Sequence, residues 1–154
     1  FEGTVTRIEL PSDIDNGISD DDFTRGQSFY DLMIKADPSN PNVAYVGGID
    51  LFRTDNGGDS NGSNNPWNQI SHWYGMSGLQ FAHADQHSSV ISSADSNKIL
   101  FGNDGGIFYS DNQGTNLGSR NYNYHTSQYY TIAVAPSTMF ENHSVTHRGT
   151  ESGV

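Results

Sequence analysis

The sequence of 154 residues contains no cysteine, only seven lysine and arginine residues, and no long apolar run. Without cysteine the chain can form neither disulfide bonds nor thiolate metal sites. Because a transmembrane helix needs ~20 consecutive apolar residues, we expect no membrane span. The 18 Asp and Glu residues give a net charge of −11, which repels phosphate backbones, so nucleic acid is not an expected partner.

Helical periodicity is also missing from the sequence. No segment free of glycine and proline places apolar residues at the spacing of an amphipathic helix. Short β-branched and aromatic runs recur instead, separated by turns rich in Asn, Gly, Asp and Ser, and this pattern predicts an all-β protein. The expected strands are residues 4–10, 30–35, 43–47, 51–54, 67–71, 88–92, 99–102, 107–110, 122–124 and 129–135.

The sequence repeats itself. Residues 42–58 align with residues 97–114, about 55 positions further along, with one residue inserted between the two halves of the match. A third copy begins at residues 130–134, which match residues 30–34, and it runs to the last residue. Each copy predicts four antiparallel strands, the unit of a β-propeller blade. Since a propeller needs ~4–8 blades, we expect a partial propeller of about two whole blades plus fragments.

The repeat also sets the expected domain organisation. We assign residues 28–82 and 83–126 to two blades, and residues 127–154 to the start of a further blade. Residues 1–27 are assigned to part of a preceding blade with an acidic loop. The chain starts at Phe1 without an initiator methionine or a leader, so we expect a processed product or a segment of a longer protein.

Two turns of the repeat resemble the Asp-box, Ser/Thr-x-Asp-x-Gly-x-Thr-Trp, of BNR and sortilin-like propellers. Both copies carry Asn in place of the Asp, and neither has the closing Trp. A hydroxyl and an Asn side chain satisfy backbone N–H groups in such a turn, while glycine supplies positive φ, so we read these residues as structural. They are Thr54, Asn56, Gly58 and Ser60 in the first copy, and Ser110, Asn112 and Gly114 in the second.

A longer stretch gives a more specific likeness. Residues 83–87 and 98–107 resemble secreted propellers of the sortilin-like, xyloglucanase-related group, common among Bacteroidetes and often exported with a C-terminal sorting domain of the type IX kind. The likeness covers residues 28–154. It implies a secreted or cell-surface protein whose partners are a glycan or an extracellular protein, together with the rest of its own propeller.

His83, Asp85 and His87 alternate along the sequence, so in an extended strand they share one face. In the repeat alignment His87 takes the position of Leu32 and Ile132, which we expect to face inward. One interpretation is a metal facet of imidazole and carboxylate ligands. The interpretation we favour is a hydrogen-bonded polar network. In either case these residues are candidates for ligand binding.

Asn103 and Asp104 stand on a two-glycine turn between expected strands. In hydrolases of the group that the sequence resembles, acidic residues on such loops line the sugar cleft. Asp85 and Asp104 are therefore candidates for a general acid and base, although Asp-Gly is also a common hairpin turn, and we favour that interpretation. We expect no catalytic residue and keep both positions as ligand-binding candidates.

An acidic loop lies near the N-terminus. Asp13, Asp15, Ser19 and Asp21 alternate as oxygen ligands do in calcium loops, but no bidentate Glu follows. We favour a solvated acidic loop and expect no cofactor, with calcium as the alternative.

Most aromatic residues are expected in the core. Trp73 and Tyr74 are the exception, because they adjoin glycines in an expected long loop, where they could stack on sugar rings. The sequence thus predicts a non-catalytic extracellular binding or structural module. Two alternatives stay open, namely a xyloglucanase-like glycoside hydrolase acting on β-glucans and a cell-surface or filament component completed by other chains.

Overall fold

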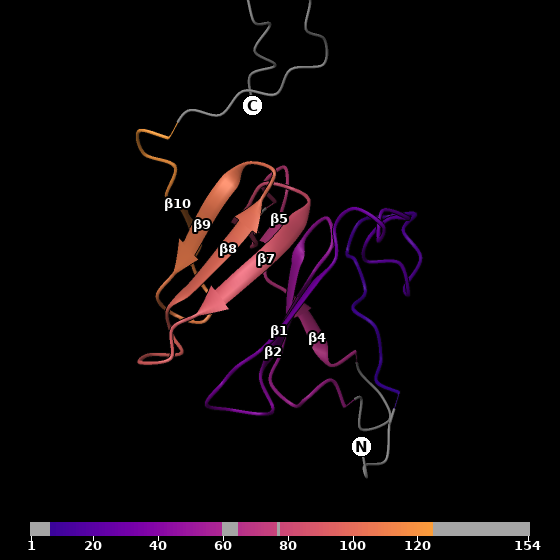
Figure 1. Ribbon diagram of the computed structural model, residues 1–154. Helices are drawn as coiled ribbons and strands as arrows, with labels where there is room; N and C mark the ends of the chain where they lie inside the picture. The colour runs from indigo at the N-terminus through magenta and orange to yellow at the C-terminus, as the bar shows by residue number, and fades with distance from the viewer. Residues whose placement is uncertain (1–6, 60–64, 77, 125–154) are drawn as a thin grey trace, which may run out of the picture. The chain divides into compact units, whose positions relative to one another are not determined.

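The chain forms an all-β structure. The computed structural model describes residues 7–59, 65–76 and 78–124, which contain ten strands and no helix (Figure 1). The all-β prediction is confirmed for this part of the chain. The ten strands belong to one compact unit, residues 1–122, and Asn123 and Tyr124 belong to a second unit. Ser60, Ile132 and the strand expected at 129–135 lie outside the described residues.

Two four-stranded sheets make up most of this structure, and each is an antiparallel meander. A short pair of parallel strands forms a separate two-stranded sheet. The first sheet contains β1 (Met33–Ala36), β2 (Ala44–Gly47), β3 (Leu51–Thr54) and β4 (Trp67–Gln69). The second contains β7 (Gln86–Ile91), β8 (Ile99–Asn103), β9 (Gly106–Ser110) and β10 (Gly118–Ser119), and the parallel pair is β5 (Ser71–His72) and β6 (Gln80–Phe81).

Two of the expected strands are placed wrongly. Residues 7–10 are not in a strand, although the sequence predicts one there. The fourth strand of the second sheet is β10 and not residues 122–124. β10 pairs with β9, with Gly118 opposite Tyr109, and it begins only a few residues after the turn that follows β9. The edge of β9 is therefore already paired before the chain reaches Tyr122 and Tyr124. Tyr122 and Tyr124 are exposed, so their β-propensity is not used.

The turns after β3 and β9 have the same hydrogen bonds in both sheets. The hydroxyl at the end of each strand accepts the N–H of the glycine four residues on and donates to the Asn side chain two residues on. These bonds measure 3.1 and 2.7 Å at Thr54, and 2.8 and 3.0 Å at Ser110. The glycines, Gly58 and Gly114, have φ values of +80° and +88°. The repeat in the sequence is therefore a repeat in local structure.

An isoleucine covers each of these glycines. A Cβ added at Gly58 would lie 2.8 Å from Cδ1 of Ile8, and one added at Gly114 would lie 2.7 Å from Cδ1 of Ile70. Ile8 precedes the first sheet, and Ile70 follows β4 and precedes the second sheet. Each sheet thus has its turn covered by the segment that leads into it.

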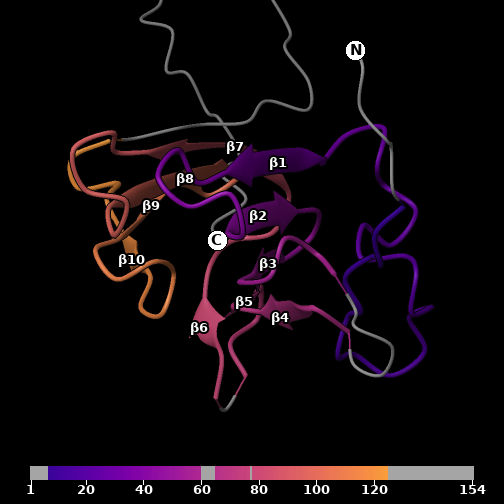
Figure 2. The ribbon, with the colours of Figure 1, turned by 90° about the horizontal axis from the view of Figure 1, so that it is seen from below.

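The two sheets share a core. Tyr45 of β2 and Phe101 of β8 are fully buried and meet edge to face, with ring centroids 5.8 Å apart. β1 lies beside β7, as both ribbon views show (Figures 1 and 2). The approach is close at this point, because a Cβ on Gly47 would lie 2.5 Å from Cβ of Gln86. Burial of this apolar surface is the main term that holds the sheets together.

An aromatic pair recurs in the two sheets. Phe23 packs on Phe52 of β3 with ring centroids 5.7 Å apart, and Phe81 packs on Phe108 of β9 at 5.8 Å. Phe52 and Phe108 are equivalent in the sequence repeat. The segments before the two sheets therefore pack on them in the same way.

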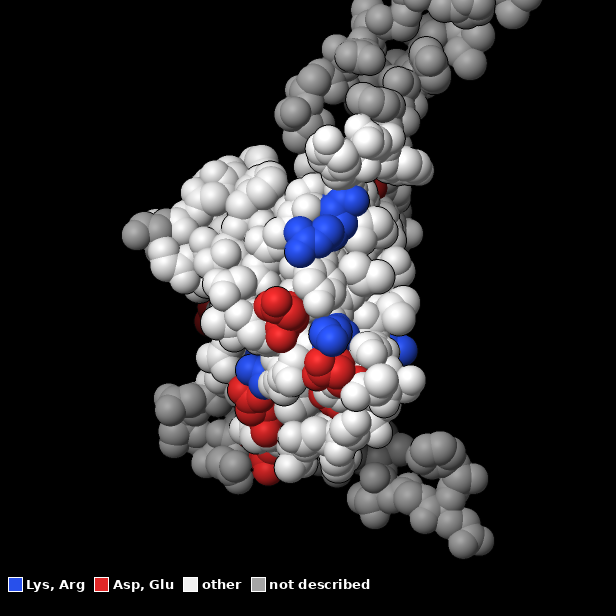
Figure 3. Space-filling view, turned by 90° about the vertical axis from the view of Figure 1, so that its left-hand side faces the viewer, with Lys and Arg blue, Asp and Glu red and all other residues white. Residues whose placement is uncertain are grey.

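The described residues contain nothing that could cross a bilayer as an apolar helix. Their surface mixes charges of both signs. On the face in Figure 3, acidic and basic side chains lie beside one another in the lower part, and a basic area lies above them.

Candidate functional site

Polar side chains gather at one end of both sheets. We call this the turn end and define it by the β2–β3 turn (residues 48–50), the β8–β9 turn (residues 104–105), and the segments that lead into β1 and β7. In meanders of this kind, alternate turns lie at the same end. The two sheets are joined there, since the N–H groups of Asp85 and Gln86 donate to the carbonyls of Ile49 and Gly48, at 3.2 and 2.8 Å.

Asp104 has two polar partners at the turn end. Nε2 of His87 lies 2.6 Å from Oδ1 of Asp104, and the hydroxyl of Tyr30 donates to both carboxylate oxygens at 3.0 and 2.9 Å. Partial burial disfavours the charge of Asp104, but the hydrogen bonds from His87 and Tyr30 outweigh it and lower the pKa of this carboxyl group. Asp104 is therefore held as an anion.

Asp85 reaches Asp104 by a bend and not by a strand. Its φ is +65°, and β7 begins only at Gln86, so the expectation that His83, Asp85 and His87 share a face of an extended strand is wrong. The bend instead brings the carboxyl group of Asp85 beside that of Asp104. Burial, followed by the charge of Asp104, raises the pKa of Asp85.

Two further expectations about this region are revised. Leu32 was expected to face inward, but its side chain is 57% exposed, because it precedes β1 and the buried residue is Met33. His87, its equivalent, is exposed as well. Asn103 is the buried last residue of β8, and its side-chain oxygen Oδ1 accepts the N–H of Gly105 at 3.1 Å, so this side chain shapes the β8–β9 turn.

Asp31 belongs to the same group, and the sequence analysis did not single it out. Its side chain is fully buried, and neither carboxylate oxygen has a hydrogen-bond donor among the described residues. Burial, together with the nearby charge of Asp85, raises the pKa of Asp31 to about 6. The sequence signal for Asp31 was in the repeat, because Asp31 aligns with Gln86 and both copies therefore have a polar residue at this position. Both side chains are fully buried in the structure.

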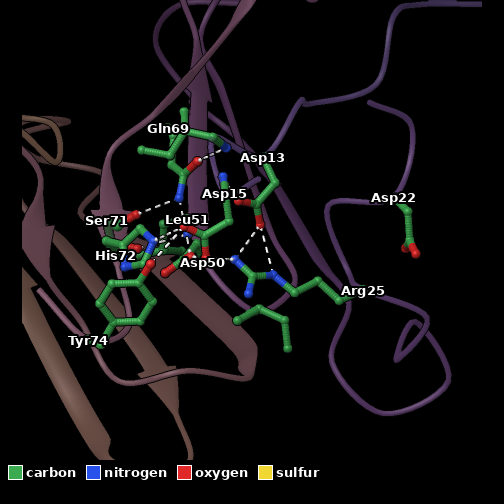
Figure 4. A network of polar contacts seen from close by, with 12 residues as sticks. Asp13, Asp15, Asp22, Arg25, Asp50, Leu51, Gln69, Ser71, His72 and Tyr74 are labelled. Carbon is green, nitrogen blue, oxygen red and sulfur yellow. Dashed lines mark hydrogen bonds and ion pairs between the residues drawn. The ribbon is translucent and has the colours of Figure 1, made fainter. Parts of the chain in front are cut away.

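A second group of polar side chains surrounds Arg25. It is connected to the group around Asp104 through the β2–β3 turn, because Asp50 approaches Arg25 and the carbonyl of the neighbouring Ile49 accepts the N–H of Asp85. Figure 4 shows Arg25 directed at Asp13, while Asp22 lies apart. Nε and Nη2 of Arg25 donate to Oδ2 of Asp13 at 3.0 and 2.8 Å, and Nη2 also donates to Oδ2 of Asp15 at 2.7 Å. A guanidinium that bridges two carboxylates in this way is a strong, oriented contact. It closes the acidic loop on itself, and Nη2 of Arg25 also lies 4.0 Å from Oδ2 of Asp50 in the β2–β3 turn.

Asp15 links the acidic loop to the segment after β5. The hydroxyl of Tyr74 donates to Oδ1 of Asp15 at 2.8 Å, and Nε2 of the buried His72 lies 3.2 Å from the same atom (Figure 4). Partial burial opposes the charge of Asp15, but the bonds from Tyr74, Arg25 and His72 outweigh it and lower its pKa.

Asp50, in the β2–β3 turn, is fully buried. Its Oδ2 accepts a hydrogen bond from Nε2 of Gln69 at 3.2 Å, and its Oδ1 has no partner among the described residues. Burial, together with the charge of Asp13, raises the pKa of Asp50 to about 7, although Arg25 acts in the opposite direction. Asp50 is the second buried carboxyl group that the sequence analysis missed.

The acidic loop does not gather its oxygens around a common point. Asp13 and Asp15 face Arg25, and the hydroxyl of Ser19 donates to Oδ1 of Asp21 at 2.6 Å. Across residues 7–59, 65–76 and 78–124, no three His, Cys, Asp or Glu side chains are arranged to hold a metal ion. Within these ranges the positive charge beside Asp13 and Asp15 is the guanidinium of Arg25.

Trp73 and Tyr74 lie at the surface beside this loop. Their side chains are 42% and 52% exposed, and their rings meet edge to face at 4.8 Å. The ring of Tyr74 also lies 3.9 Å from that of His72, so the pair rests on a buried base. Such a pair offers an apolar surface with a hydrogen-bonding edge.

Comparison of the chain with models of known protein families, with curated proteins and with solved structures gives no match in any of the three.

Proposed function

We propose that the chain is a section of a β-propeller of the sortilin-like or BNR class and that the surface around Trp73 and Tyr74, beside the acidic loop, is a non-catalytic, extracellular binding surface for a glycan. The observation that carries the proposal is the exposed Trp73–Tyr74 pair, which is anchored on Asp15 and His72. Sugar rings stack on such aromatic faces, and adjacent carboxylates accept hydrogen bonds from sugar hydroxyls. A protein partner at this surface is the alternative that remains if none of the glycans in the test below is bound.

The proposal that the chain is part of a propeller is supported by a comparison of the same face in the two sheets, which is covered in the first sheet and exposed in the second. Tyr45 and Leu51 of the first sheet are fully buried, whereas their equivalents in the second sheet, Leu100 and Ile107, are 41% and 40% exposed. Val90 of β7 is exposed on the same sheet. A further sheet that covered this face would repeat the contact between the first two. That sheet would come from the rest of the propeller or from another chain.

The carboxyl pair at the turn end does not favour glycoside hydrolysis. A glycosidase needs one carboxyl group that gives a proton to the leaving group and a second that attacks the sugar or activates water. Both oxygens of Asp104 already accept hydrogen bonds from the hydroxyl of Tyr30, and Nε2 of His87 lies 2.6 Å from one of them. A carboxylate engaged in this way is poorly placed to act on a glycosidic bond.

Binding to immobilised neutral, N-acetylated and amino glycans tests the proposal, followed by titration calorimetry with the best ligand. We expect Trp73→Ala to weaken binding up to about tenfold, because an aromatic stacking contact is worth roughly 0.5–1.5 kcal/mol and ~1.4 kcal/mol is a factor of ten. Trp73→Phe, which keeps a stacking face, should retain most of the affinity. Failure of the protein to bind any of the glycans, or unchanged affinity in Trp73→Ala, would contradict the proposal.

A further inference from the structure

The dipeptide Asn-Gly occurs three times in the sequence, at residues 16–17, 56–57 and 61–62. The third copy lies outside the described residues. The first two follow Asp15 and Asp55, so both read Asp-Asn-Gly, and in both the Asn and the Gly are exposed. One of them lies in the acidic loop and the other in the turn after β3. The same tripeptide therefore stands in two different local structures.

An Asn side chain can react with the backbone of the residue that follows it. The backbone nitrogen of that residue attacks the side-chain carbonyl carbon, the new N–C bond closes a cyclic imide, and the amide nitrogen leaves as ammonia with the proton of the attacking N–H. Water then opens the imide at either carbonyl, which gives aspartate or isoaspartate. Glycine favours the attack, because it has no Cβ and its backbone is the least restricted.

At Asn56, hydrogen bonds hold every group that this reaction needs. The hydroxyl of Thr54 donates to Oδ1 of Asn56 at 2.7 Å, and Nδ2 of Asn56 donates to the carbonyl of Asp59 at 2.6 Å. The N–H of Gly57, which would attack, donates to the carbonyl of Asn42 at 2.7 Å. These bonds must break before the ring can close, so the turn opposes the reaction.

Equivalent hydrogen bonds are missing at Asn16. Among the described residues, neither the side-chain amide of Asn16 nor the N–H of Gly17 has a hydrogen-bond partner. Across this turn the N–H of Ile18 donates to the carbonyl of Asp15 at a long 3.4 Å. Steric cover does not distinguish the two sites, since a Cβ added at Gly17 or at Gly57 would meet nothing within 4 Å. The difference between them is hydrogen bonding.

We propose that Asn16 is a site of spontaneous deamidation in the folded protein, whereas Asn56 is protected by its turn. Either product adds a negative charge next to Asp15, and isoaspartate also lengthens the backbone of the acidic loop. Because Asp15 accepts the hydroxyl of Tyr74 at 2.8 Å, the modification acts on a support of the exposed aromatic pair. The reaction needs only water, so it proceeds whether or not the chain binds a glycan.

The test is peptide mapping by mass spectrometry after incubation at mildly alkaline pH, which helps the attacking nitrogen to lose its proton. Trypsin cuts after Arg7 and Arg25, and Asn16 is the only amide side chain in the peptide of residues 8–25, so the mass of that peptide reports this site alone. Asn56 falls in the peptide of residues 54–98, which holds other Asn residues, so fragment ions are needed to locate the change.

In the folded protein we expect Asn16 to convert at least about tenfold faster than Asn56, because the hydrogen bonds that hold Asn56 must break first. In guanidinium chloride the two sites should convert at similar rates, because both are Asp-Asn-Gly and neither is held. Equal rates in the folded protein, or a faster rate at Asn56, would overturn the proposal. So would a preference for Asn16 that persists unchanged in the unfolded chain, since that would come from the sequence and not from the structure.

Thr54→Ala tests the source of the protection. It removes the hydroxyl that holds Oδ1 of Asn56, so Asn56 should convert faster while Asn16 keeps its rate. Thr54→Ser is the matched control, because it keeps the hydroxyl and should keep Asn56 protected. An unchanged rate at Asn56 in Thr54→Ala would contradict protection by this hydroxyl. The comparison of Asn16 with Asn56 in the parent protein decides the proposal even where Thr54→Ala does not fold.

Discussion

At the scale of the residue, Asp31 and Asp50 are carboxyl groups whose ionised forms are destabilised by burial in the folded protein. Both side chains are fully buried, and both have oxygens without a donor among the described residues. Burial raises the pKa of Asp31 to about 6 and that of Asp50 to about 7, from an ordinary value of 3.8. The folded protein therefore keeps protons that the unfolded chain releases near pH 4.

This predicts a protein that is more stable in mild acid than in mild base. The contribution of a carboxyl group with a raised pKa is complete below pH ~4 and is lost as the pH rises toward 7, because only the unfolded state ionises freely. Between pH 5 and pH 7, Asp50 alone should remove roughly 2 kcal/mol from the free energy of unfolding. Urea unfolding at pH 5 and at pH 8 measures this difference.

Asp50→Asn separates the effect of Asp50 from that of other groups. The amide cannot ionise, and it still accepts the hydrogen bond from Gln69. Its stability should fall less between pH 5 and pH 8 than that of the parent protein, whereas Asp111→Asn should follow the parent. The lowered pKa values of Asp15 and Asp104 also stabilise the fold, but their contribution is already complete above pH ~4 and is lost only as the pH falls below that value, so it stays constant between pH 5 and pH 8. A parent protein that gains stability across this range would refute the assignment.

At the scale of the element, the hydroxyl–Asn–glycine turn determines how each meander continues from its third strand to its fourth. Thr54 and Ser110 are both buried, and each hydroxyl serves a backbone N–H and an Asn side chain at once. Removing a buried hydroxyl leaves these groups unsatisfied.

Thr54→Ala and Ser110→Ala should each lower the free energy of unfolding by about 1–3 kcal/mol. Thr54→Ser keeps the hydroxyl and should lose less. Chemical denaturation followed by tryptophan fluorescence would give the values. Equal losses in Thr54→Ala and Thr54→Ser would show that the methyl group, and not the hydroxyl, matters.

The elements also show how far the sequence could be interpreted. The repeat identified β2, β3, β8 and β9, because β-branched and aromatic runs bounded by turn residues depend on local preferences. It placed the fourth strand of the second sheet wrongly, because β10 is only two residues long and its position depends on pairing with β9. Local propensity does not contain that information.

The polar group at the turn end could be predicted only in part. His87 and Asp104 stood out because an aliphatic residue and a plainer turn occupy the equivalent positions of the first repeat, and Asp85 stood out because it alternates with His83 and His87. Tyr30 contacts Asp104 from a segment 74 positions earlier in the sequence, and only the tertiary structure brings those two segments together. The bend at Asp85 depends on an unusual φ, which an alternating pattern does not indicate.

At the scale of the whole molecule, the second sheet leaves an apolar face uncovered. Val90, Leu100 and Ile107 are exposed there, while the equivalent face of the first sheet is buried. Apolar faces of this kind favour association. In the absence of a further blade, we expect copies of the chain to associate through them.

Leu100→Glu combined with Ile107→Lys should shift the protein toward monomer, as measured by light scattering over a range of concentrations. The two substitutions together leave the net charge unchanged, so a general charge effect is excluded. Ile34→Glu, at another exposed aliphatic side chain, is the comparison. A parent protein that is monomeric at every concentration would contradict the expectation.

The isoleucines over the two turn glycines bear on where the chain can be cut. Ile8 lies over Gly58 and Ile70 lies over Gly114, so each cover is encoded upstream of the sheet that it protects. A truncation that begins at residue 28 would retain every strand of the first sheet yet strip away its cover. We therefore expect a fragment that includes the lead segment on the N-terminal side of the sheet to be more stable than one cut at the sequence repeat.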